Sequence, residues 1–334
     1  MTRITLSHGS GGRLTNELIR RVFATSFSNN ELLKLEDSAQ VPVGGEKIAF
    51  TTDSYVVDPI FFAGGDIGRI AVCGTVNDLA VKGAKPIAIS AAFIIEEGLE
   101  IDVLRDIVAS MKKAATQAGV DIVTGDTKVV ERGKADKIFI TTSGVGLIPK
   151  NVELGAEKIR PGDEIILSGP LAEHGMAVMN VRNNLGLDGN IRSDGAPLNK
   201  MISSLLAVSK KIRCMKDLTR GGLATALNEI AESCRYSISV DEENIIVKSS
   251  VKGACDILGI DPLYVANEGK IIIFAEPGES QKLLSVLKKN KYGKSARTIG
   301  RVLDEKDAKV LLRTGMGGFR QVIMLEGEQL PRIC

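Results

Sequence analysis

The sequence predicts an α/β protein with two domains, and three observations support this expectation. The 334 residues exceed the size, about 150 residues, at which one hydrophobic core usually divides. Segments with helical periodicity alternate with β-rich segments. A turn-rich passage follows Pro149 and continues to "RPGDE". We therefore expect domains over residues 1–150 and 151–325, with residues 326–334 as a C-terminal tail.

The helices of the first half are predicted from apolar residues three and four positions apart. Residues 13–27 place one apolar set on a single face, namely Leu14, Leu18, Ile19, Val22 and Phe23. Residues 66–84 follow a Gly-Gly pair, and residues 101–119 end at a glycine, which is a common helix stop.

Segments rich in β-branched and aromatic residues predict strands between and after these helices. In the first half the expected strands are residues 47–57, 86–95, 120–130 and 137–148. The second half repeats the style, with an expected helix over residues 221–234 and strands at 237–240, 270–277 and 321–325. The periodicity shows no tandem repeat of the first half.

Composition excludes several classes of function. The 43 basic and 41 acidic residues nearly balance, so the chain has no excess positive charge for a nucleic-acid backbone. The longest apolar runs fall short of the roughly 20 residues that a bilayer requires, and no secretory signal begins the sequence, so a cytoplasmic protein without a membrane partner is expected. Five cysteines without a CxxC pair, and two histidines, favour neither a disulfide framework nor a zinc site.

Three aspartates of the first half are candidate ligands of a divalent ion. Asp53 is expected to end a strand, Asp78 lies in the second predicted helix, and Asp126 is expected to follow a strand. Carboxylate oxygens beside small residues suit Mg²⁺ carrying a polyphosphate. The alternative is that each aspartate caps a turn or a helix.

No common nucleotide-binding motif accompanies these aspartates. The sequence has neither a GxxxxGK[ST] loop nor a GxGxxG turn after a strand. The remaining candidate is "FFAGGDIG", where Gly64 and Gly65 precede a helix whose N-terminus would attract an anion. An ordinary turn is the alternative.

The chain ends in "LPRIC", so Cys334 is its last residue. Pro331 stiffens the approach to it, and the preceding "GEQL" is polar and turn-like, so we expect a mobile tail with one reactive tip. An incidental terminal cysteine is the alternative, because the adjacent carboxylate should raise the thiol pKa. The other four cysteines lie in apolar segments and are expected to be structural.

Several segments together resemble the HypE family of hydrogenase expression/formation proteins over nearly the whole chain. They are "SHGSGGR", "TTDSYVVDPIFFAGGDIGRIAVCGTVNDLAVKGAKP", "GDTKVVERG", "DLTRGGLATALNEIA", "ANEGK" and the terminal "LPRIC". That family belongs to a superfamily with aminoimidazole ribotide synthetase, selenophosphate synthetase and thiamine monophosphate kinase, which bind ATP without a P-loop. Lys82 departs from the pattern, where an apolar residue is expected.

The resemblance implies a PurM-like fold in which the N-terminal α/β domains of a homodimer pair their sheets into a shared barrel, with a C-terminal α/β domain beside each. It also implies an ATP-dependent carbamoyl dehydratase. The carbamoyltransferase HypF would load a carbamoyl group onto Cys334, the enzyme would dehydrate it to a thiocyanate, and the HypC–HypD complex would accept the cyano group for [NiFe] hydrogenase.

The resemblance also implies the site. Cys334, Glu268 and Lys128 would be catalytic, with Glu268 as the base and Lys128 as a cation beside the phosphates. Residues matching the ATP site are Asp37, Asp53, Gly64, Gly65, Asn77, Asp78, Asp126 and Asp217, of which Asp53, Asp78 and Asp126 would hold Mg²⁺. His174 is expected to have only a local structural role.

Two other functions remain open at this stage. One is another ATP-dependent member of the superfamily, such as a small-molecule kinase or selenophosphate synthetase, although the latter expects a cysteine or selenocysteine where "SHGSGGR" has none. The other is a non-catalytic adaptor that presents its tail to partners. An adaptor would tolerate loss of Asp53 or Asp126.

Overall fold

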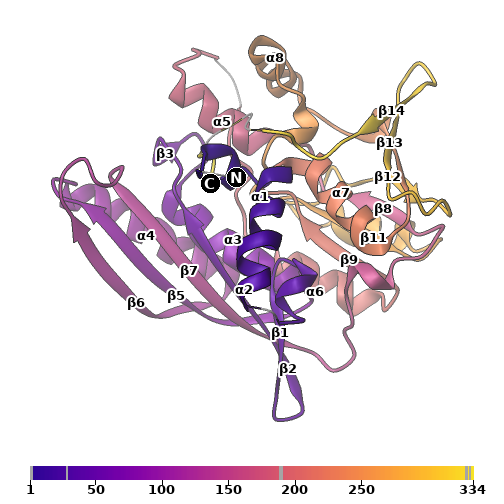
Figure 1. Ribbon diagram of the computed structural model, residues 1–334, viewed down its shortest axis with the longest axis horizontal. Helices are drawn as coiled ribbons and strands as arrows, with labels where there is room; N and C mark the ends of the chain where they lie inside the picture. The colour runs from indigo at the N-terminus through magenta and orange to yellow at the C-terminus, as the bar shows by residue number, and fades with distance from the viewer. Residues whose placement is uncertain (1–2, 28, 188–190, 328–329, 331) are drawn as a thin grey trace.

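The computed structural model describes residues 3–27, 29–187, 191–327, 330 and 332–334. Pro331 and part of the "GEQL" stretch, on which the expectation of a mobile tail rests, lie outside the described residues. Figure 1 shows the first half of the chain as a curved sheet with its helices on one side, and the second half as a separate α/β layer beside it.

The first half forms a five-stranded mixed sheet in the order β1-β2-β7-β5-β6. The pair β5 and β6 is parallel, and the other neighbours are antiparallel. The strands are β1 (Ala39–Val43), β2 (Glu46–Tyr55), β5 (Lys85–Glu96), β6 (Asp121–Val130) and β7 (Ile138–Ile148). Helices α3 (Ile67–Val81) and α4 (Ile101–Ala118) pack on the same sheet face, so the opposite face is open.

Helix α3 is the centre of the molecule. All of its residues except Arg69 are buried, because it contacts β2, β5 and β7 on one side and β9 and α6 of the second half on the other. A helix that is predominantly apolar on all sides is stable only when it is enclosed in this way. Its packing on the sheet is close at Gly144 of β7, where a Cβ atom would lie 2.7 Å from Thr75 and 2.9 Å from Leu79.

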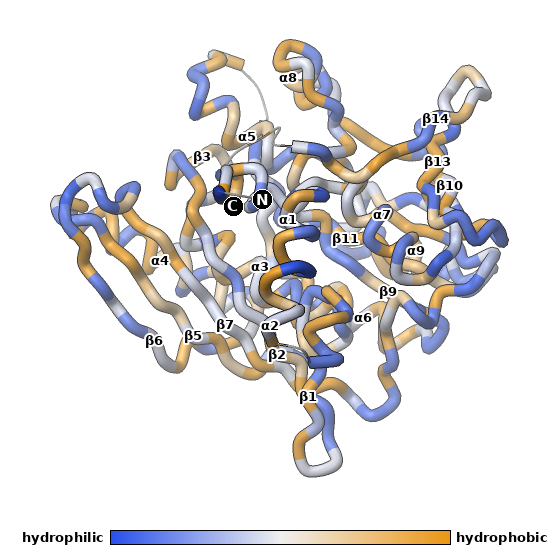
Figure 2. The backbone as a smooth tube through the Cα atoms, in the orientation of Figure 1, coloured by the Kyte–Doolittle hydropathy of each residue, from blue (hydrophilic) through white to orange (hydrophobic). Residues whose placement is uncertain are grey.

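The second half forms a seven-stranded sheet in the order β14-β13-β10-β12-β8-β11-β9. Its strands are β8 (Glu164–Leu167), β9 (Ile212–Asp217), β10 (Ile238–Asp241), β11 (Ile271–Ala275), β12 (Arg297–Val302), β13 (Val310–Arg313) and β14 (Phe319–Val322). Its helices are α5 (Glu173–Arg182), α6 (Asn199–Val208), α7 (Gly222–Cys234), α8 (Ser249–Leu258) and α9 (Ser280–Leu287). In Figure 2 the hydrophilic colour follows the loops at its outer edge.

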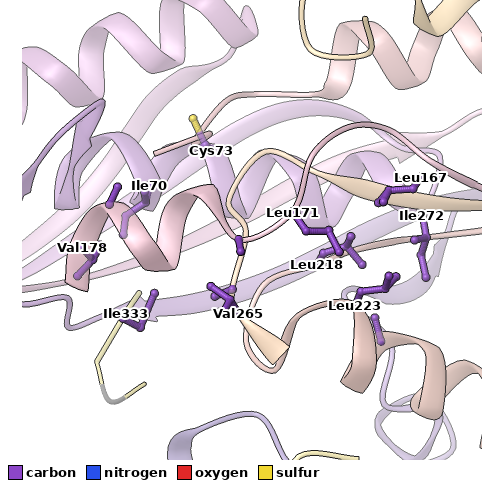
Figure 3. Close-up of a cluster of buried hydrophobic side chains, with 14 of the residues drawn as sticks. Ile70, Cys73, Leu167, Leu171, Val178, Leu218, Leu223, Val265, Ile272 and Ile333 are labelled. Carbon is purple, nitrogen blue, oxygen red and sulfur yellow. The ribbon is translucent and has the colours of Figure 1, made fainter. Parts of the chain in front are cut away.

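One buried cluster continues from the first half into the second. Its members include Ile70 and Cys73 of α3, Leu167 of β8 and Ile272 of β11, and Figure 3 shows several of these side chains together. Ile333, next to the last residue, is also a member and is 4% exposed. The end of the chain is therefore part of the core in this conformation.

The N-terminal segment and the base of the tail lie side by side, and Figure 1 shows the two ends of the chain close together. The backbone N–H of Arg13 donates to the Leu325 carbonyl at 2.9 Å, and the Ser10 hydroxyl donates to the Gly327 carbonyl at 3.1 Å. Gly12 permits this approach, since a Cβ there would lie 2.3 Å from the Leu325 oxygen.

Most predicted elements of the first half are confirmed, with corrections in detail. The helix over residues 13–27 is present as α1 (Arg13–Leu18), a π-helical turn (Ile19–Ala24) and α2 (Thr25–Phe27), but Val22 and Phe23 of its apolar face are exposed in the single chain. Asp53 and Asp126 lie within β2 and β6, and neither ends or follows a strand as expected. Near the C-terminus, the strand expected at 321–325 is β14, Phe319–Val322.

The departure at Lys82 has a structural explanation. Its side chain is 7% exposed, and its ammonium pairs with the Glu36 carboxylate. The charge is therefore neutralised where it is buried. Among the described residues, no helix has both the length and the apolar composition needed to cross a membrane.

We predict that Gly144→Ala destabilises the protein, because the added methyl group would overlap the Thr75 and Leu79 side chains of α3. Overpacking of this kind costs about 1–3 kcal/mol. Thermal unfolding of both variants would measure it against Gly253→Ala in α8, where a Cβ meets nothing within 4 Å. Removing a helix-interior glycine there should stabilise the protein by roughly 0.5–1 kcal/mol, so equal shifts in both variants would contradict the packing argument.

Candidate active site

A cavity of about 520 Å³ lies between the two halves of the chain, beside β2, α3 and the end of β9. It collects most of the predicted site: the carboxylates Asp37, Asp53, Asp78, Asp217 and Glu268, together with Cys334. Two cations, Lys216 and Arg220, line the same cavity. Residues more than 250 positions apart in the sequence thus share one enclosed space because α3 holds the two sheets together.

The cavity that contains these aspartates is lined by more carboxylates than cations. Burial, and then repulsion by Asp53 and Asp217, raises the pKa of Asp78 well above its usual range. Burial, and then the charge of Asp37, raises the pKa of Asp217 to about 7. None of the described residues forms a hydrogen bond with Asp217 Oδ2. Such a group of carboxylates favours a bound cation.

Asp37 is an exception within this group, because it is already paired. Lys216 contacts its carboxylate and lies 3.4 Å from Glu229. Burial alone would lower the pKa of Lys216, but attraction by Asp37 and Glu229 raises it well above its usual range. Lys216 therefore stays charged at the cavity wall.

Glu268 has the environment of a general base with a raised pKa. It is 2% exposed, and neither carboxylate oxygen has a hydrogen-bond partner in the described part of the chain. Burial, followed by repulsion from Asp217 and Asp194, raises its pKa well above its usual range. An unpartnered buried carboxyl costs stability. Its retention in a cavity indicates a chemical role.

A buried ion pair positions the backbone of Glu268. The Asp194 carboxylate accepts the N–H of Glu268 at 3.0 Å and the N–H of Gly269 at 3.2 Å. It also pairs with Lys270 at 2.8 Å. These contacts fix the loop that precedes β11, so the Glu268 side chain is held by groups that do not touch its carboxylate.

Asn77 supports the same loop and does not line the cavity. Its Nδ2 donates to the Ala196 carbonyl at 3.0 Å and to the Glu268 carbonyl at 3.4 Å, and its Oδ1 accepts the N–H of Leu198 at 2.8 Å. Since the amide is engaged on both sides, the structure does not place Asn77 as the cofactor ligand that was expected. It joins α3 to the second half.

Gly64 and Gly65 also lie outside the cavity. A short hairpin, β3 (Phe61–Phe62) and β4 (Gly65–Asp66), precedes α3; Gly64 lies in its turn and Gly65 begins β4. Gly64 has φ +92°, and a Cβ there would lie 2.8 Å from the backbone nitrogen of Ser193. The glycine is required for this close approach, and the N-terminus of α3 is capped instead by Asp66, which accepts the N–H of Arg69 at 2.9 Å.

Asp126 and Lys128 pair with each other at 2.6 Å on the exposed edge strand β6. The sheet register runs from Asp53 through Thr142 and Ala91 to Gly125. Three strand spacings, about 14 Å in total, therefore separate Asp53 from this position. Asp126 also points to the open face, since its neighbour Gly125 shares the face of Asp53. Within a single chain, the structure does not bring Asp126 and Lys128 to the other predicted site residues.

Arg220 is a cavity residue that the sequence reasoning missed. It lies in the "DLTRGGL" segment, of which only Asp217 was assigned. Among the described residues, no carboxylate lies within ion-pair distance of Arg220. Electrostatic interaction with Cys334, ahead of other causes, raises the pKa of Arg220. A Cβ at Gly11 would lie 2.5 Å from its Cβ, so the N-terminal glycines pack directly against it.

The Cys334 thiol is neutral in this position. Burial raises its pKa to about 12, although attraction by Arg220 opposes the shift. The backbone N–H of Val56 donates to the terminal carbonyl oxygen of Cys334 at 3.0 Å, which places the residue at the cavity wall. The thiol therefore lies at the cavity but is not activated as a nucleophile. The other four cysteines are free, and Cys73, Cys214 and Cys255 are buried, as expected for structural residues.

No three His, Cys, Asp or Glu side chains converge on one metal position within the part of the chain that the structure describes. The carboxylates of Asp53, Asp78 and Asp217 nevertheless suit a hard divalent ion, because their mutual repulsion is relieved by positive charge. Mg²⁺ commonly takes few protein ligands and completes its shell with water and phosphate oxygens. The residues present therefore fit such an ion.

Family models cover both halves of the chain. Residues 35–148 match the N-terminal domain of AIR synthase related proteins, and residues 160–313 match the C-terminal domain of the same family. Among named relatives, carbamoyl dehydratase HypE of Rhodobacter capsulatus is 48% identical, covering 99% of this chain and 98% of its own. Carbamoyl dehydratase HypE of Escherichia coli is 43% identical over the full length of both proteins.

Solved structures agree with these relationships. A HypE chain in a HypE–HypF complex superposes with a TM-score of 0.88 at 46% identity, covering 92% of this chain and 99% of that one. HypE in complex with ATP gives a TM-score of 0.84 at 45% identity, covering 99% and 100%. With this identity and coverage, and with the terminal cysteine and acidic cavity in place, the chain belongs to the HypE family of carbamoyl dehydratases.

Proposed function

We propose that this protein dehydrates an S-carbamoyl group on Cys334 to a thiocyanate at the expense of ATP, and so supplies cyanide for [NiFe] hydrogenase maturation. The observation that carries the proposal is the shared cavity, in which the terminal cysteine lies with the buried, unpartnered carboxyl of Glu268. The HypE relatives with their printed activity, and the ATP complex of one of them, support it.

The reaction requires removal of an oxygen that is a poor leaving group. In our proposal the carbamoyl oxygen attacks the γ-phosphorus of ATP, and ADP leaves. The C–O bond then breaks, so the oxygen departs with phosphate. The nitrogen loses both of its protons, one of which leaves with the phosphate, and the carbon becomes a nitrile on sulfur. Glu268 accepts one of these protons, for which its raised pKa is suited.

Asp53, Asp78 and Asp217 would hold Mg²⁺ together with the ATP phosphates. When bound, the ion would neutralise charge on the phosphates during transfer. The chain itself contributes the fixed positive charge of Arg220 in the same cavity. Lys216 is less suited to that task, because Asp37 and Glu229 already pair with it.

Loading of Cys334 would take place away from the cavity. In the retracted position the thiol pKa of about 12 leaves almost no thiolate at neutral pH. A partner that carbamoylates the thiol must therefore reach it in another environment, which requires residues 326–334 to act as a movable tail. HypF fits this role, since a HypE relative forms a complex with HypF. The HypC–HypD complex would accept the cyano group.

A second copy of the chain would complete the site. The open face of the first sheet exposes Phe50, Ile94 and Leu147, which favours coverage by another sheet. We propose that residues 1–150 form this dimer contact, that residues 151–325 form the neighbouring domain, and that Asp126 and Lys128 act in the cavity of the partner copy. Their separation from Asp53 within one chain supports this arrangement.

The test of the function is direct. The protein is incubated with HypF, its substrates and MgATP, and the C-terminal peptide is followed by mass spectrometry. We expect a carbamoyl adduct on Cys334 that loses one water only as ATP is hydrolysed. An adaptor that merely presents its tail would keep the adduct, and a small-molecule kinase would hydrolyse ATP without changing this peptide.

We predict that Glu268→Gln lowers the single-turnover dehydration rate by about 10²–10⁴, the usual contribution of a general base. Loading by HypF should not change, because the tail thiol is unaltered. The wild-type rate should rise with pH through a midpoint above the ordinary glutamate value of 4.5, since a base acts when deprotonated and the pKa of Glu268 is raised. A full rate in Glu268→Gln would remove it from the mechanism.

We predict that Lys128→Ala and Glu268→Gln complement each other. If Lys128 acts across the dimer, half of the randomly mixed dimers contain one intact site, so mixing the two inactive proteins should restore about one quarter of the wild-type activity. Each variant alone is the control. Mixed dimers that stay inactive would place Lys128 in its own chain's site, and wild-type activity of Lys128→Ala alone would exclude the residue.

A further inference from the structure

The last residues of the chain are held by their main chain. The carbonyl of Arg332 accepts a bond from Arg182 of α5 at 2.6 Å, and the terminal carbonyl of Cys334 accepts the N–H of Val56 at 3.0 Å. Between them, the carbonyl of Ile333 is 2.9 Å from Nε2 of His174. Successive carbonyls of the tail thus each meet a donor from the body of the protein.

His174 is the one side chain of this set that the chain buries completely, at 0% exposure among the described residues. A carbonyl oxygen only accepts hydrogen bonds, so Nε2 must carry the proton. Burial lowers the pKa of His174, which favours the neutral ring with a single N–H. Nδ1 is then an acceptor, and the Ser193 hydroxyl lies 2.8 Å away to donate to it.

The surroundings fix the imidazole in place. Phe62 contacts the ring edge-on, with centroids 5.3 Å apart. The Ser193 backbone N–H donates to the Ala63 carbonyl at 2.7 Å, and its backbone packs against Gly64, where no Cβ would fit. The Gly-Gly turn that suggested an anion site therefore supports Ser193, which in turn orients His174 toward the tail.

The segment that carries Ser193 also contacts the backbone of Glu268. Asp194, next to Ser193, accepts the N–H of Glu268 at 3.0 Å. One short segment therefore braces the side chain that binds the tail and the loop that carries Glu268. A shift of the tail carbonyl by one ångström would be transmitted to neighbours of both reacting groups, and misplacement of this size is costly in catalysis.

We propose that His174 is a positioning residue that holds the retracted tail by its Ile333 carbonyl and so sets the place of Cys334 opposite Glu268. The proposal rests on the proposed function for its catalytic consequence, but the docking itself is independent of any reaction. His174 recognises main chain, so the same contact serves the tail with a free, carbamoylated or cyanated sulfur.

The test measures how often Cys334 leaves the cavity. Full-length protein is treated with iodoacetamide, and alkylation of the C-terminal peptide is timed by mass spectrometry. His174→Phe keeps the ring size and removes the donor. We expect Cys334 to be alkylated about fivefold to tenfold faster, which corresponds to loss of one hydrogen bond of ordinary net strength. His174→Gln, whose Nε2 also donates, should stay within about twofold of wild type.

Two controls separate docking from damage to the fold. The chain has one other histidine, and His8→Phe removes a ring bonded only to Thr5, so Cys334 should react at the wild-type rate. Cys73 and Cys255 are buried and report unfolding in the same digest. If His174→Phe exposes them as well, Ser193→Ala provides the second variant. It leaves the ring in place, removes the donor to Nδ1, and should still speed alkylation of Cys334 alone.

Catalysis supplies the second readout. In His174→Phe the dehydration kcat should fall about tenfold while the KM for ATP is unchanged, because the ATP cavity is intact. Loading by HypF should not slow, because the thiol leaves the cavity more often. Wild-type alkylation and kcat in a folded His174→Phe protein would overturn the proposal. Faster alkylation of Cys334 in a protein that never forms thiocyanate would instead leave the docking role standing and reject the proposed function.

Discussion

The arrangement depends on a short antiparallel pairing between residues 332–334 and residues 56–58. Val56 donates to Cys334 and Asp58 donates to Arg332, and the Arg332 side chain returns a bond to the Val56 carbonyl at 3.0 Å. This pairing continues from the end of β2, on which Asp53 lies. The strand that carries part of the acidic cavity therefore also receives the terminal cysteine.

Burial decides how strongly this end of the chain is held. The apolar side chain of Ile333 is buried in the main cluster. This burial contributes roughly 1.5–3 kcal/mol. The main-chain bonds to Arg182, His174 and Val56 each add a net contribution of about 1 kcal/mol or less. Against this stands the entropy of ordering several residues, about 1–2 kcal/mol each. The favourable and unfavourable contributions nearly cancel. Such a balance is needed by a tail that must both enter the cavity and leave it.

The sequence predicted the elements of the first half well, because their signals are local. Helical periodicity and glycine stops located α3 and α4, and β-branched runs located β2, β5, β6 and β7. The acidic group around Asp53, Asp78 and Asp217 came together as the resemblance implied. These positions depend on strand and helix assignments that hydrophobic pattern determines.

The residues that lie outside the cavity, and those whose surroundings were not anticipated, depend on contacts that no local pattern contains. Gly64 is needed because Ser193, far along the chain, approaches its backbone. Asp126 lies away from Asp53 because the order β2-β7-β5-β6 puts two strands between theirs. Lys82 has its partner in Glu36. Arg220 was passed over because an arginine in a loop is ordinarily a solvated residue. Only the cavity reveals that it lies beside Cys334 and that no carboxylate of the described residues pairs with it.

The same desolvation that raises the Cys334 pKa determines which chemical form of the tail enters the cavity. A thiolate would lose its hydration on entering a cavity already crowded with carboxylates, so the charged tip is excluded, whereas a carbamoylated sulfur is neutral and enters without that cost. Entry therefore favours the loaded tail over the reactive thiolate. Arg220 moderates the penalty without abolishing it, since the thiol pKa remains raised in its presence. The cost of desolvating the thiolate therefore accounts both for loading of Cys334 outside the cavity and for dehydration inside it.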